Sequence, residues 1–440
     1  MHKINIQPFL YSRQTFLVAG TLLLAVSPFL SCALYSAAAL VTLFDCRKEI
    51  FNSKERVTIV SLIFVISVWM IFRKISPENV DPGAIALSDY SPFYFFLFFL
   101  SLKPFTNSES EKFSYALTLT VPQHFLLALG EKYMGWHGGI SFPKGKIHIL
   151  DIFVGAFDGN AAMTAGFYNR NLLGLYGVIC VAVSLSLFLN EIKKMKELGL
   201  IKTNSVLRIT WTALSLVLSI VLLAWTESRN GWFAFIFVIT AFLWLGRRIL
   251  ILKIAAIILP ALTVLAMSNP GKLSKFARFL IPGSLGSRLS STNAFFDVFS
   301  GERGDIYHCA VQLISEKPIT GWGIGAFQSE CSSRIGHRVS HAHNIALQLG
   351  TDIGIPVALL VICLIGYFIG RSIYRFAKPW DCQYGNDILS KGLLVAAVAV
   401  ILMQVFDLAL FMTYRLNFLF WIALAIPYSR AVYKRSAQTF

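Results

Sequence analysis

Residues 303–356 have the sequence RGDIYHCAVQLISEKPITGWGIGAFQSECSSRIGHRVSHAHNIALQLGTDIGIP. This stretch is polar, basic and punctuated by glycine, and it contains His308, His337, His341 and His343 out of the eight histidines of the chain. The segments on either side of it are mostly apolar. We interpret the stretch as the reactive region of the protein, and the apolar segments as a scaffold that holds it at a bilayer surface.

The composition of the whole chain supports a membrane protein. Its 440 residues are 56% hydrophobic and 14% charged, with a mean hydropathy of +0.64, whereas a soluble protein is about 25% charged. Apolar runs of about 15–20 residues recur from end to end, and each is about long enough to cross roughly 30 Å of hydrocarbon. The runs lack the period-two alternation of a membrane β-barrel. We therefore predict an all-α, polytopic membrane protein.

The apolar runs predict about twelve transmembrane helices. The first two belong to one long run that is broken near Pro28, so eleven helices is the alternative, and one run is short for a full crossing. The predicted spans are approximately 13–27, 31–44, 57–73, 92–102, 113–129, 170–189, 207–226, 231–246, 249–266, 354–370, 391–411 and 416–430.

The loops between these spans predict the orientation. Lys and Arg concentrate in short loops that fall on one side, which places both termini in the cytoplasm. The net charge of +16 follows from those loops, so nucleic acid is not an expected partner. The basic segments are 45–56, 191–202, 246–253, 371–391 and 430–435, and the two long exterior loops are 130–169 and 267–353. The chain thus divides into helices 1–9 within residues 1–266, a large exterior loop at 267–353, and helices 10–12 with a cytoplasmic tail at 354–440.

The larger exterior loop has some predicted structure of its own. Apolar positions at helical spacing predict a helix over residues 303–315, which Lys317-Pro318 ends. The glycines of 321–325 then form a flexible turn, and they follow no strand, so we reject a dinucleotide site. Cys309 and Cys331 lie in this loop, and the sequence leaves open whether they form a disulfide. The seven cysteines show no CxxC pair and no metal-ligand spacing.

Three polar motifs meet at the exterior face under this topology. TESRNGW at 226–232 lies between two spans, Arg303 begins the loop helix, and HAHN at 341–344 leads into the next span. An arginine offers a permanent charge and a bidentate fork that suits phosphate oxygens. A neutral imidazole, with an unperturbed pKa of about 6.5, can accept a proton from a hydroxyl.

The pattern resembles the bacterial O-antigen ligase and polymerase family. The resemblance rests on FYNRN at 167–171, SRNGW at 228–232, KPITGWGIGAF at 317–327 and HAHNIALQLGTDIGIP at 341–356, with Arg303 between the second and third motifs. These motifs cover about residues 160–370. Each is short, and their order and placement make the resemblance specific.

The resemblance implies a glycosyltransferase-C-like fold and an inverting, metal-independent transfer of glycan from undecaprenyl diphosphate at the periplasmic face of the inner membrane. The acceptor would be a sugar hydroxyl of lipid A–core in a ligase, or a second lipid-linked glycan in a polymerase. Arg229 and Arg303 match the arginines that hold the diphosphate, and His343 matches the essential histidine. No cofactor and no metal are implied. We add Arg170, His341, Asn344, Arg338 and Arg334 as candidate substrate-binding residues.

Each candidate also has a structural interpretation. Arg229 could anchor a helix end at the lipid headgroups, and Arg303 could be a solvated residue in a first helical turn. His343 could be a satisfied loop histidine, and Asn344 suits a helix cap. Asp407 falls within the predicted span 391–411, where a carboxylate is either functional or bound structurally, for example to Tyr414 or Arg415.

The sequence favours a ligase over a polymerase because of the single large late loop. Two other classes remain as alternatives. Twelve spans would suit a transporter or lipid flippase, but the spans carry few of the ionisable residues that line a transport path. A structural membrane partner could use the basic loop as a docking surface.

Overall fold

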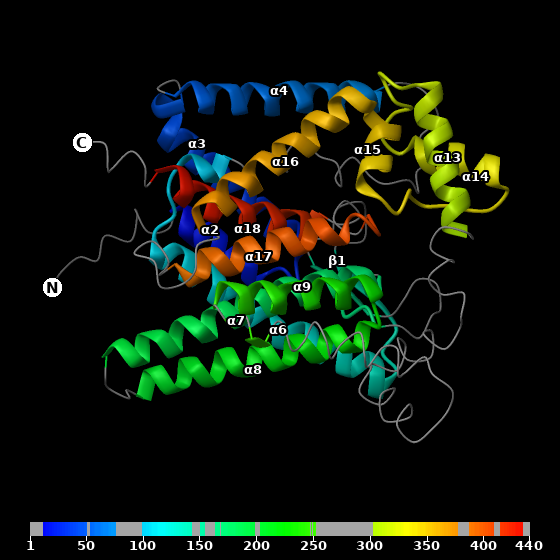
Figure 1. The fold of residues 1–440 in the computed structure, drawn as a ribbon. Helices are drawn as coiled ribbons and strands as arrows, with labels where there is room; N and C mark the ends of the chain where they lie inside the picture. Colours follow the sequence, from blue (N-terminus) through cyan, green and yellow to red (C-terminus); the bar gives the residue numbers. More distant parts are fainter. Residues whose placement is uncertain are drawn as a thin grey trace.

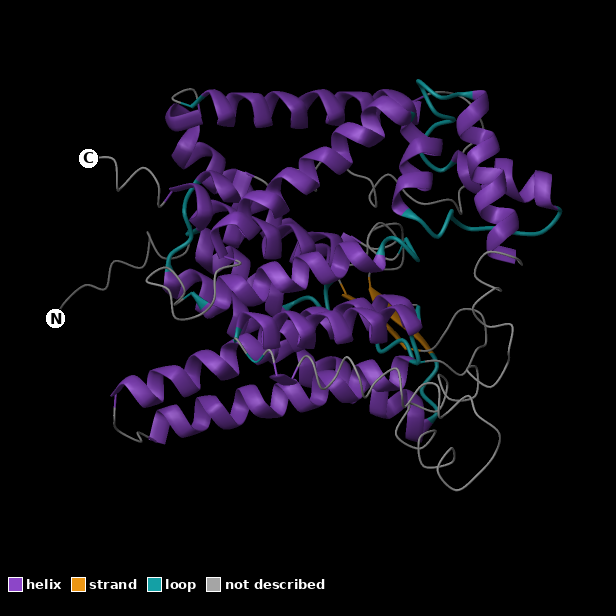
Figure 2. Ribbon diagram, in the orientation of Figure 1, coloured by secondary structure: helices purple, strands orange, loops and turns teal. Residues whose placement is uncertain are grey.

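The computed structural model describes residues 12–50, 53–75, 99–142, 150–154, 163–167, 169–198, 203–246, 248, 250–251, 302–376, 387–408 and 414–433. This part of the chain is mostly helical (Figure 2). The long helices run side by side as a bundle, and shorter helices gather at one end of it (Figure 1).

The bundle contains ten α-helices and one short 3-10 turn within the described residues. Five of them are long and apolar enough to cross a membrane, namely α3, α4, α7, α8 and α16, and α9, α17 and α18 are shorter apolar helices. This confirms an integral membrane protein, while the count of twelve spans stays a prediction. The predicted spans 92–102 and 249–266 fall mostly outside the described residues. The bounds are α2 (Arg13–Leu22), α3 (Pro28–Ile50), α4 (Lys54–Ile75), η1 (Leu100–Leu102), α6 (Asn107–Met134), α7 (Arg170–Leu198), α8 (Thr203–Thr226), α9 (Arg229–Leu245), α16 (Ile355–Phe376), α17 (Ile388–Met403) and α18 (Tyr414–Tyr433).

Helix α7 is the centre of the bundle. From Leu172 onward the next five turns are mostly apolar on every face, and nearly all of these residues are buried, as expected for a helix that is hydrophobic all round. It packs against α8, α17, α9 and α6. Helices α4 and α8 leave most of their apolar surface uncovered, which suits a lipid-facing position.

The end of the bundle at which α2 begins holds buried ion pairs. Arg13 donates to both carboxylate oxygens of Glu109 at 2.8 Å and to three backbone carbonyls. Arg430 lies 2.9 Å from Asp387, which also caps α17. These contacts tie α2 to α6 and α18 to α17.

The other end of the bundle carries a cap, which we define as residues 302–353. It consists of α13 (Glu302–Glu316), α14 (Ala326–Ile335) and α15 (Ile345–Ile353), which Figure 1 shows together beyond the end of α4. A disulfide joins Cys309 of α13 to Cys331 of α14, and this answers the question that the sequence left open. A small core separate from that of the bundle lies around the disulfide, with Ala310, Leu313 and Phe327.

A seam of backbone hydrogen bonds joins residues 318–323 of the cap to the end of α15 and the start of α16. Trp322 N–H donates to the carbonyl of Thr351 (2.7 Å), and Ile355 N–H donates to that of Pro318 (2.8 Å). Gly354 has φ 81°, and a Cβ there would meet the carbonyl oxygen of Ile319 at 2.0 Å, so only glycine fits. The glycine turn at 321–325, expected to be flexible, is therefore held in place.

The predicted helix at 303–315 is confirmed as α13, which ends before Lys317-Pro318. Other parts of the sequence interpretation change. The sequence analysis did not anticipate α14, α15 or an antiparallel hairpin of β1 (Gly138–Phe142) and β2 (Leu150–Val154), so the fold is not purely α-helical.

Asp407 is not inside a transmembrane helix, as its placement in the span 391–411 required. Helix α17 ends at Met403, because the chain turns at Gln404, and Asp407 follows that turn. The side chains of Tyr414 and Arg415, named as its structural partners, lie outside the described residues.

Candidate functional site

Asp407 organises the polar site at the cap end of the bundle. Its Oδ1 lies 3.2 Å from Nε2 of His341 and 3.1 Å from Nδ1 of His343, and it also accepts the N–H of Leu408 at 2.9 Å. The carboxylate is buried, with 3% of its surface exposed. A buried carboxylate must be hydrogen-bonded, and here both histidines of the HAHN motif satisfy it.

The second oxygen of Asp407 connects the site to the other motifs. Asn171, the last residue of the FYNRN motif, donates its side-chain N–H to Asp407 Oδ2. Ser228, the first residue of SRNGW, donates its hydroxyl to Asn171 Oδ1 at 2.9 Å, and accepts the N–H of Gly231 as the cap of α9. One chain of hydrogen bonds therefore joins three motifs that are far apart in sequence.

The motif glycine Gly231 has a packing role beside this chain. It lies buried where α9 meets α7, and a Cβ at this position would come within 2.8 Å of Leu223 and 3.6 Å of the Cα of Gly174. A larger side chain would collide with Leu223 of α8 and crowd the contact of α9 with α7. Because Ser228 bonds to Asn171 across that contact, the close approach keeps the network intact.

All three described non-glycine residues with positive φ surround the site. They are His343 (φ 50°), Glu227 (φ 52°), which precedes Ser228, and Ala165 (φ 42°), which lies in the turn before α7. A left-handed conformation costs a non-glycine residue about 1–3 kcal/mol and persists only where the surroundings impose it. These strained residues lie at the ends of three motifs. Their positions indicate that surrounding contacts fix the backbone geometry of the site.

The turn that contains Ala165 is supported from α6. Glu131 accepts the N–H of Thr164 at 2.8 Å and its hydroxyl at 2.6 Å, and also the N–H of Ala165 at 3.1 Å. His124 lies 2.8 Å from the carbonyl of Ala165 through its Nδ1. These contacts fix the chain just before Asn171.

Asp407 and His341 both have a pKa below the usual range of their residue type. Burial opposes the charge of Asp407, but hydrogen bonds from His341 and His343 and their charges hold the pKa of Asp407 well below its usual range. Burial lowers the pKa of His341, and the charges of His343 and Arg303 lower it further against the raising effect of Asp407. Ser340 Oγ lies 2.7 Å from His341 Nδ1, so His341 has polar partners on both ring nitrogens.

The arginines predicted to bind the diphosphate lie at the same end. Arg229 is the first residue of α9, next to Ser228, and it is exposed. Arg303 lies half-buried in the first turn of α13. Its positive charge is close enough to lower the pKa of His341 and to oppose the rise in the pKa of Tyr307. Arg170 is half-buried at the start of α7, next to Asn171.

The remaining predicted residues have other surroundings. Arg334 forms a two-pronged ion pair with Glu316 at 2.6 and 2.8 Å, so its charge is already matched. Arg338 is exposed in the segment between α14 and His341. Asn344 caps α15 through Ala346 and Leu347, as its residue type indicated, and donates to the carbonyl of Val405 at 2.9 Å. Substrate binding by these three residues stays a prediction.

His341, His343 and Asp407 also form a set of donors that could hold a metal ion, since their ligand atoms lie within 4.8 Å of one another. Two imidazoles and one carboxylate suit a transition metal such as zinc. However, Asp407 Oδ1 already has hydrogen-bond geometry to both imidazoles and to Leu408 N–H. Hydrogen bonds alone therefore account for the arrangement.

Asn171 and Asp407 are the site residues that the sequence analysis did not select. Asn171 belongs to the FYNRN motif, in which the charged neighbour Arg170 was predicted as the substrate-binding residue. Asp407 was considered as a carboxylate in an apolar run, either functional or bound to Tyr414 or Arg415, and was not linked to the histidines. The HAHN motif has two histidines and no carboxylate beside them in the sequence. That pattern could have suggested a distant carboxylate such as Asp407 as their partner.

A comparison with known protein families matches part of the chain. A model of the O-antigen ligase family, Wzy_C, matches residues 214–362, which confirms the family expected from the sequence. The matched segment contains Arg229, Arg303, His341 and His343, whereas Asn171 and Asp407 lie outside it. No match was found among curated proteins.

Proposed function

Starting from its match to the O-antigen ligase family, we propose that the protein is a membrane glycosyltransferase that transfers glycan from undecaprenyl diphosphate to a sugar hydroxyl of lipid A–core. The transfer is inverting and metal-independent. His343 acts as the general base, and Arg229 and Arg303 stabilise the diphosphate. The observation that carries the proposal is the hydrogen bond between His343 and the buried carboxylate of Asp407.

That hydrogen bond selects the reactive nitrogen. When Nδ1–H of His343 donates to Asp407, the lone pair of its Nε2 is left for the acceptor hydroxyl. His343 is about one quarter exposed, whereas His341 is 5% exposed at its side chain. Of the two imidazoles, His343 is thus the one that a substrate can reach, and His341 acts as a positioning residue.

The bond changes balance in one displacement. The acceptor oxygen attacks the anomeric carbon and forms the new glycosidic bond, its proton passes to Nε2 of His343, and the bond from the anomeric carbon to the diphosphate oxygen breaks. Undecaprenyl diphosphate leaves with the electron pair. The charge on its oxygens grows as this bond breaks, so the arginines stabilise the transition state more than the ground state.

The supporting residues take their roles from their positions. Arg170, beside Asn171, is placed to add a third charge for the diphosphate. Arg338 and Asn344 flank the histidines and are proposed to contact sugar, whereas the guanidinium of Arg334 is already bound to Glu316. A lipid-linked donor also requires an opening toward the bilayer at the level of Arg229. The exposed apolar side chains of Phe233 and Ile236 on α9 support such a path.

Two features support a periplasmic site in the inner membrane. The disulfide between Cys309 and Cys331 lies in the cap, and disulfides persist in oxidising compartments such as the periplasm. Lys and Arg are frequent at the opposite helix ends, as at Arg47 and Lys48 of α3, where cytoplasmic loops are expected to be basic.

The test uses purified protein in detergent, undecaprenyl-diphosphate-linked glycan and EDTA, with and without lipid A–core. We expect glycan on the core only when core is present. Longer glycan on the carrier without core would instead identify a polymerase, and lipid scrambling with no new bond would identify a transporter. The matched variant is His343→Asn, because asparagine tolerates positive φ but cannot act as the base. Near wild-type transfer by this variant would contradict the role of His343.

A further inference from the structure

A wide groove lies on the outside of the bundle, far from the histidines, between α2, α6 and the start of α8. It encloses about 910 Å³. Its residues are of two kinds, charged and polar ones near the helix ends and apolar ones further along. They are Gln14, Thr15, Val18, Ala19, Leu22, Ser108, Glu111, Lys112, Tyr115, Ala116, Leu119 and Arg208.

The two kinds of residue are separated along the helix axes. Lys112 and Arg208 lie at the beginnings of the apolar parts of α6 and α8, where those helices enter the membrane, and both are exposed. Leu119 is seven residues further along α6, which is roughly 10 Å deeper at 1.5 Å per residue. A charged rim with an apolar wall about 10 Å below it matches the boundary between lipid headgroups and acyl chains.

The apolar wall has room for a chain. Ala19 of α2 and Ala116 of α6 carry the smallest apolar side chains of the wall, and Leu22 and Leu119 border it with 36% and 45% of their surface exposed. Small side chains between larger ones leave a furrow on a helix surface. In a membrane, an acyl chain is the apolar group available to fill it.

The rim has an excess of positive charge. Lys194 lies 2.9 Å from both Glu111 and Glu191, and Arg208 lies 3.2 Å from Glu111. Two carboxylates thus face these two cations, and Lys112 adds a third. The surplus favours an anionic headgroup over a zwitterionic one.

We propose that this groove is a binding site for one anionic phospholipid, in the leaflet opposite the cap. Lys112 and Arg208 hold its phosphate, and one acyl chain lies against Ala19, Ala116 and Leu119. The bound lipid fastens α2 to α6 and α8. The site is independent of the glycosyl transfer proposed above.

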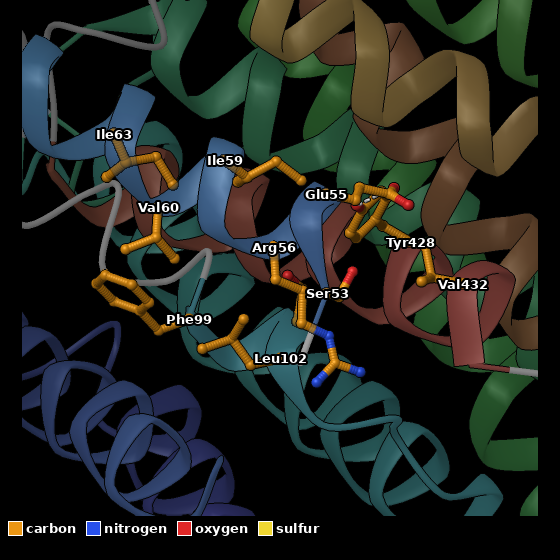
Figure 3. Close-up of a pocket in the computed structure, with 11 residues that line it drawn as sticks. Ser53, Glu55, Arg56, Ile59, Val60, Ile63, Phe99, Leu102, Tyr428 and Val432 are labelled. Carbon is orange, nitrogen blue, oxygen red and sulfur yellow. Dashed lines mark hydrogen bonds between the residues drawn. The ribbon is translucent and has the colours of Figure 1, made fainter. Parts of the chain in front are cut away.

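A second groove at the same end of the bundle provides a comparison. It lies between the start of α4, residues 99–102 and α18, with Arg56, Ile59, Phe99 and Tyr428 on its walls (Figure 3). It combines a cation with apolar side chains in the same way, but it encloses only about 30 Å³. That space holds about one water molecule, so no acyl chain is expected there.

The test is native mass spectrometry of the full-length protein with phosphatidylglycerol or with phosphatidylethanolamine of the same acyl chains. We expect tighter binding of phosphatidylglycerol and about fivefold weaker binding of it in Lys112→Gln, since one cation near an anionic headgroup contributes about that factor. Arg56→Gln, the matched loss of a cation beside the small groove, leaves the affinity unchanged. Equal affinity for both lipids, or equal effects of the two variants, would overturn the proposal.

A third variant tests the acyl-chain wall separately from the charge. Leu119→Trp keeps every charge of the rim and fills the furrow from a lipid-facing position, so it is expected to remain folded and to lose phosphatidylglycerol binding. Unchanged binding in this variant would show that the lipid does not lie in the groove. If Leu119→Trp does not fold, the phosphatidylglycerol affinity of Lys112→Gln, which changes only an exposed side chain, still tests the proposal.

Discussion

At the end of the bundle away from the cap, Arg13 is bound to Glu109 and Arg430 to Asp387, whereas at the cap end the carboxylate of Asp407 is surrounded by two imidazoles and one amide. Both arrangements satisfy buried carboxylates. The first matches each negative charge with a permanent positive charge. The arrangement around Asp407 uses a neutral amide and two imidazoles, which carry a charge only when protonated.

The difference separates a structural contact from a reactive one. An arginine bound to a carboxylate cannot change its protonation state near neutral pH, so the pairs at the far end act only as fasteners between helices. An imidazole that donates one N–H to a carboxylate keeps a second nitrogen that can take up a proton. The cap end therefore stabilises the fold and retains a base, and the following predictions test that contrast.

The largest effect is expected from Asp407→Asn. The amide removes the negative charge that faces both imidazoles, and its NH2 group would stand against the donating side chain of Asn171 in place of Oδ2, so His343 loses its fixed orientation and tautomer. We expect the turnover rate to fall about 10²- to 10⁴-fold with little change in KM for the lipid-linked glycan, measured by the transfer assay. The control is Asp387→Asn, the same change at the far end, which should retain turnover. Equal losses in the two variants would remove the distinction between the ends.

The converse experiment is Arg13→Ala. It leaves the largely buried Glu109 without its cation and three carbonyls without their donor, and breaking such a pair costs about 3–5 kcal/mol. We expect a clearly lower unfolding temperature in detergent, with near-normal turnover per folded molecule at low temperature. A loss of turnover without a loss of stability would contradict the fastening role.

Arg303→Lys is expected to have a smaller effect, on activity alone. Lysine keeps the charge and loses the two-pronged fork that suits phosphate oxygens, and we expect kcat/KM to fall about tenfold. Arg334→Lys is the matched change in the cap, at an arginine whose fork is already bound to Glu316, and it should leave kcat/KM within about twofold of wild type. If Arg334→Lys had the stronger effect, the assignment of the two arginines would be reversed.

The smallest effect concerns pH. Burial lowers the pKa of His341 in the folded protein, so below pH of about 6.5 the unfolded chain takes up a proton that the folded chain does not. The contribution of His341 to the free energy of unfolding is therefore fully present above that pH. It declines as the pH falls toward the folded pKa, by at most about 1.4 kcal/mol per pH unit. We expect the unfolding temperature to drop less between pH 7.5 and 5.5 in His341→Gln than in wild type. A larger drop in the variant would show the opposite sign.

The sequence predicted the parts of the molecule whose signal is local. Apolar runs identified the helices of the bundle, and α13 was predicted almost to its ends because Lys317-Pro318 stops it. The motifs also identified His343, Arg229 and Arg303 as residues of one face. Each of these features depends on neighbours within a few residues.

The parts that were missed depend on long-range contacts. Asp407 looked like an intramembrane carboxylate because the apolar run continues past Met403, and its partners His341 and His343 are more than sixty residues away. The strands β1 and β2 are stable only through each other. The ion pair of Arg334 with Glu316 requires α14 to pack on α13, which no local pattern specifies.

The seam between the cap and α16 has a consequence for how the protein opens. Trp322 and Gly323 donate their backbone N–H groups to Thr351 and Asp352 of α15, and Ile355 of α16 donates its own to Pro318. Because a Cβ on Gly354 would also collide with the carbonyl of Ile319, the cap and the start of α16 are expected to move together. For the proposed glycan substrate, we expect entry from the side of α9, where no backbone hydrogen bond joins the cap to α9 among the described residues. In deuterium exchange, the amides of the seam should be the slowest to label outside the helices.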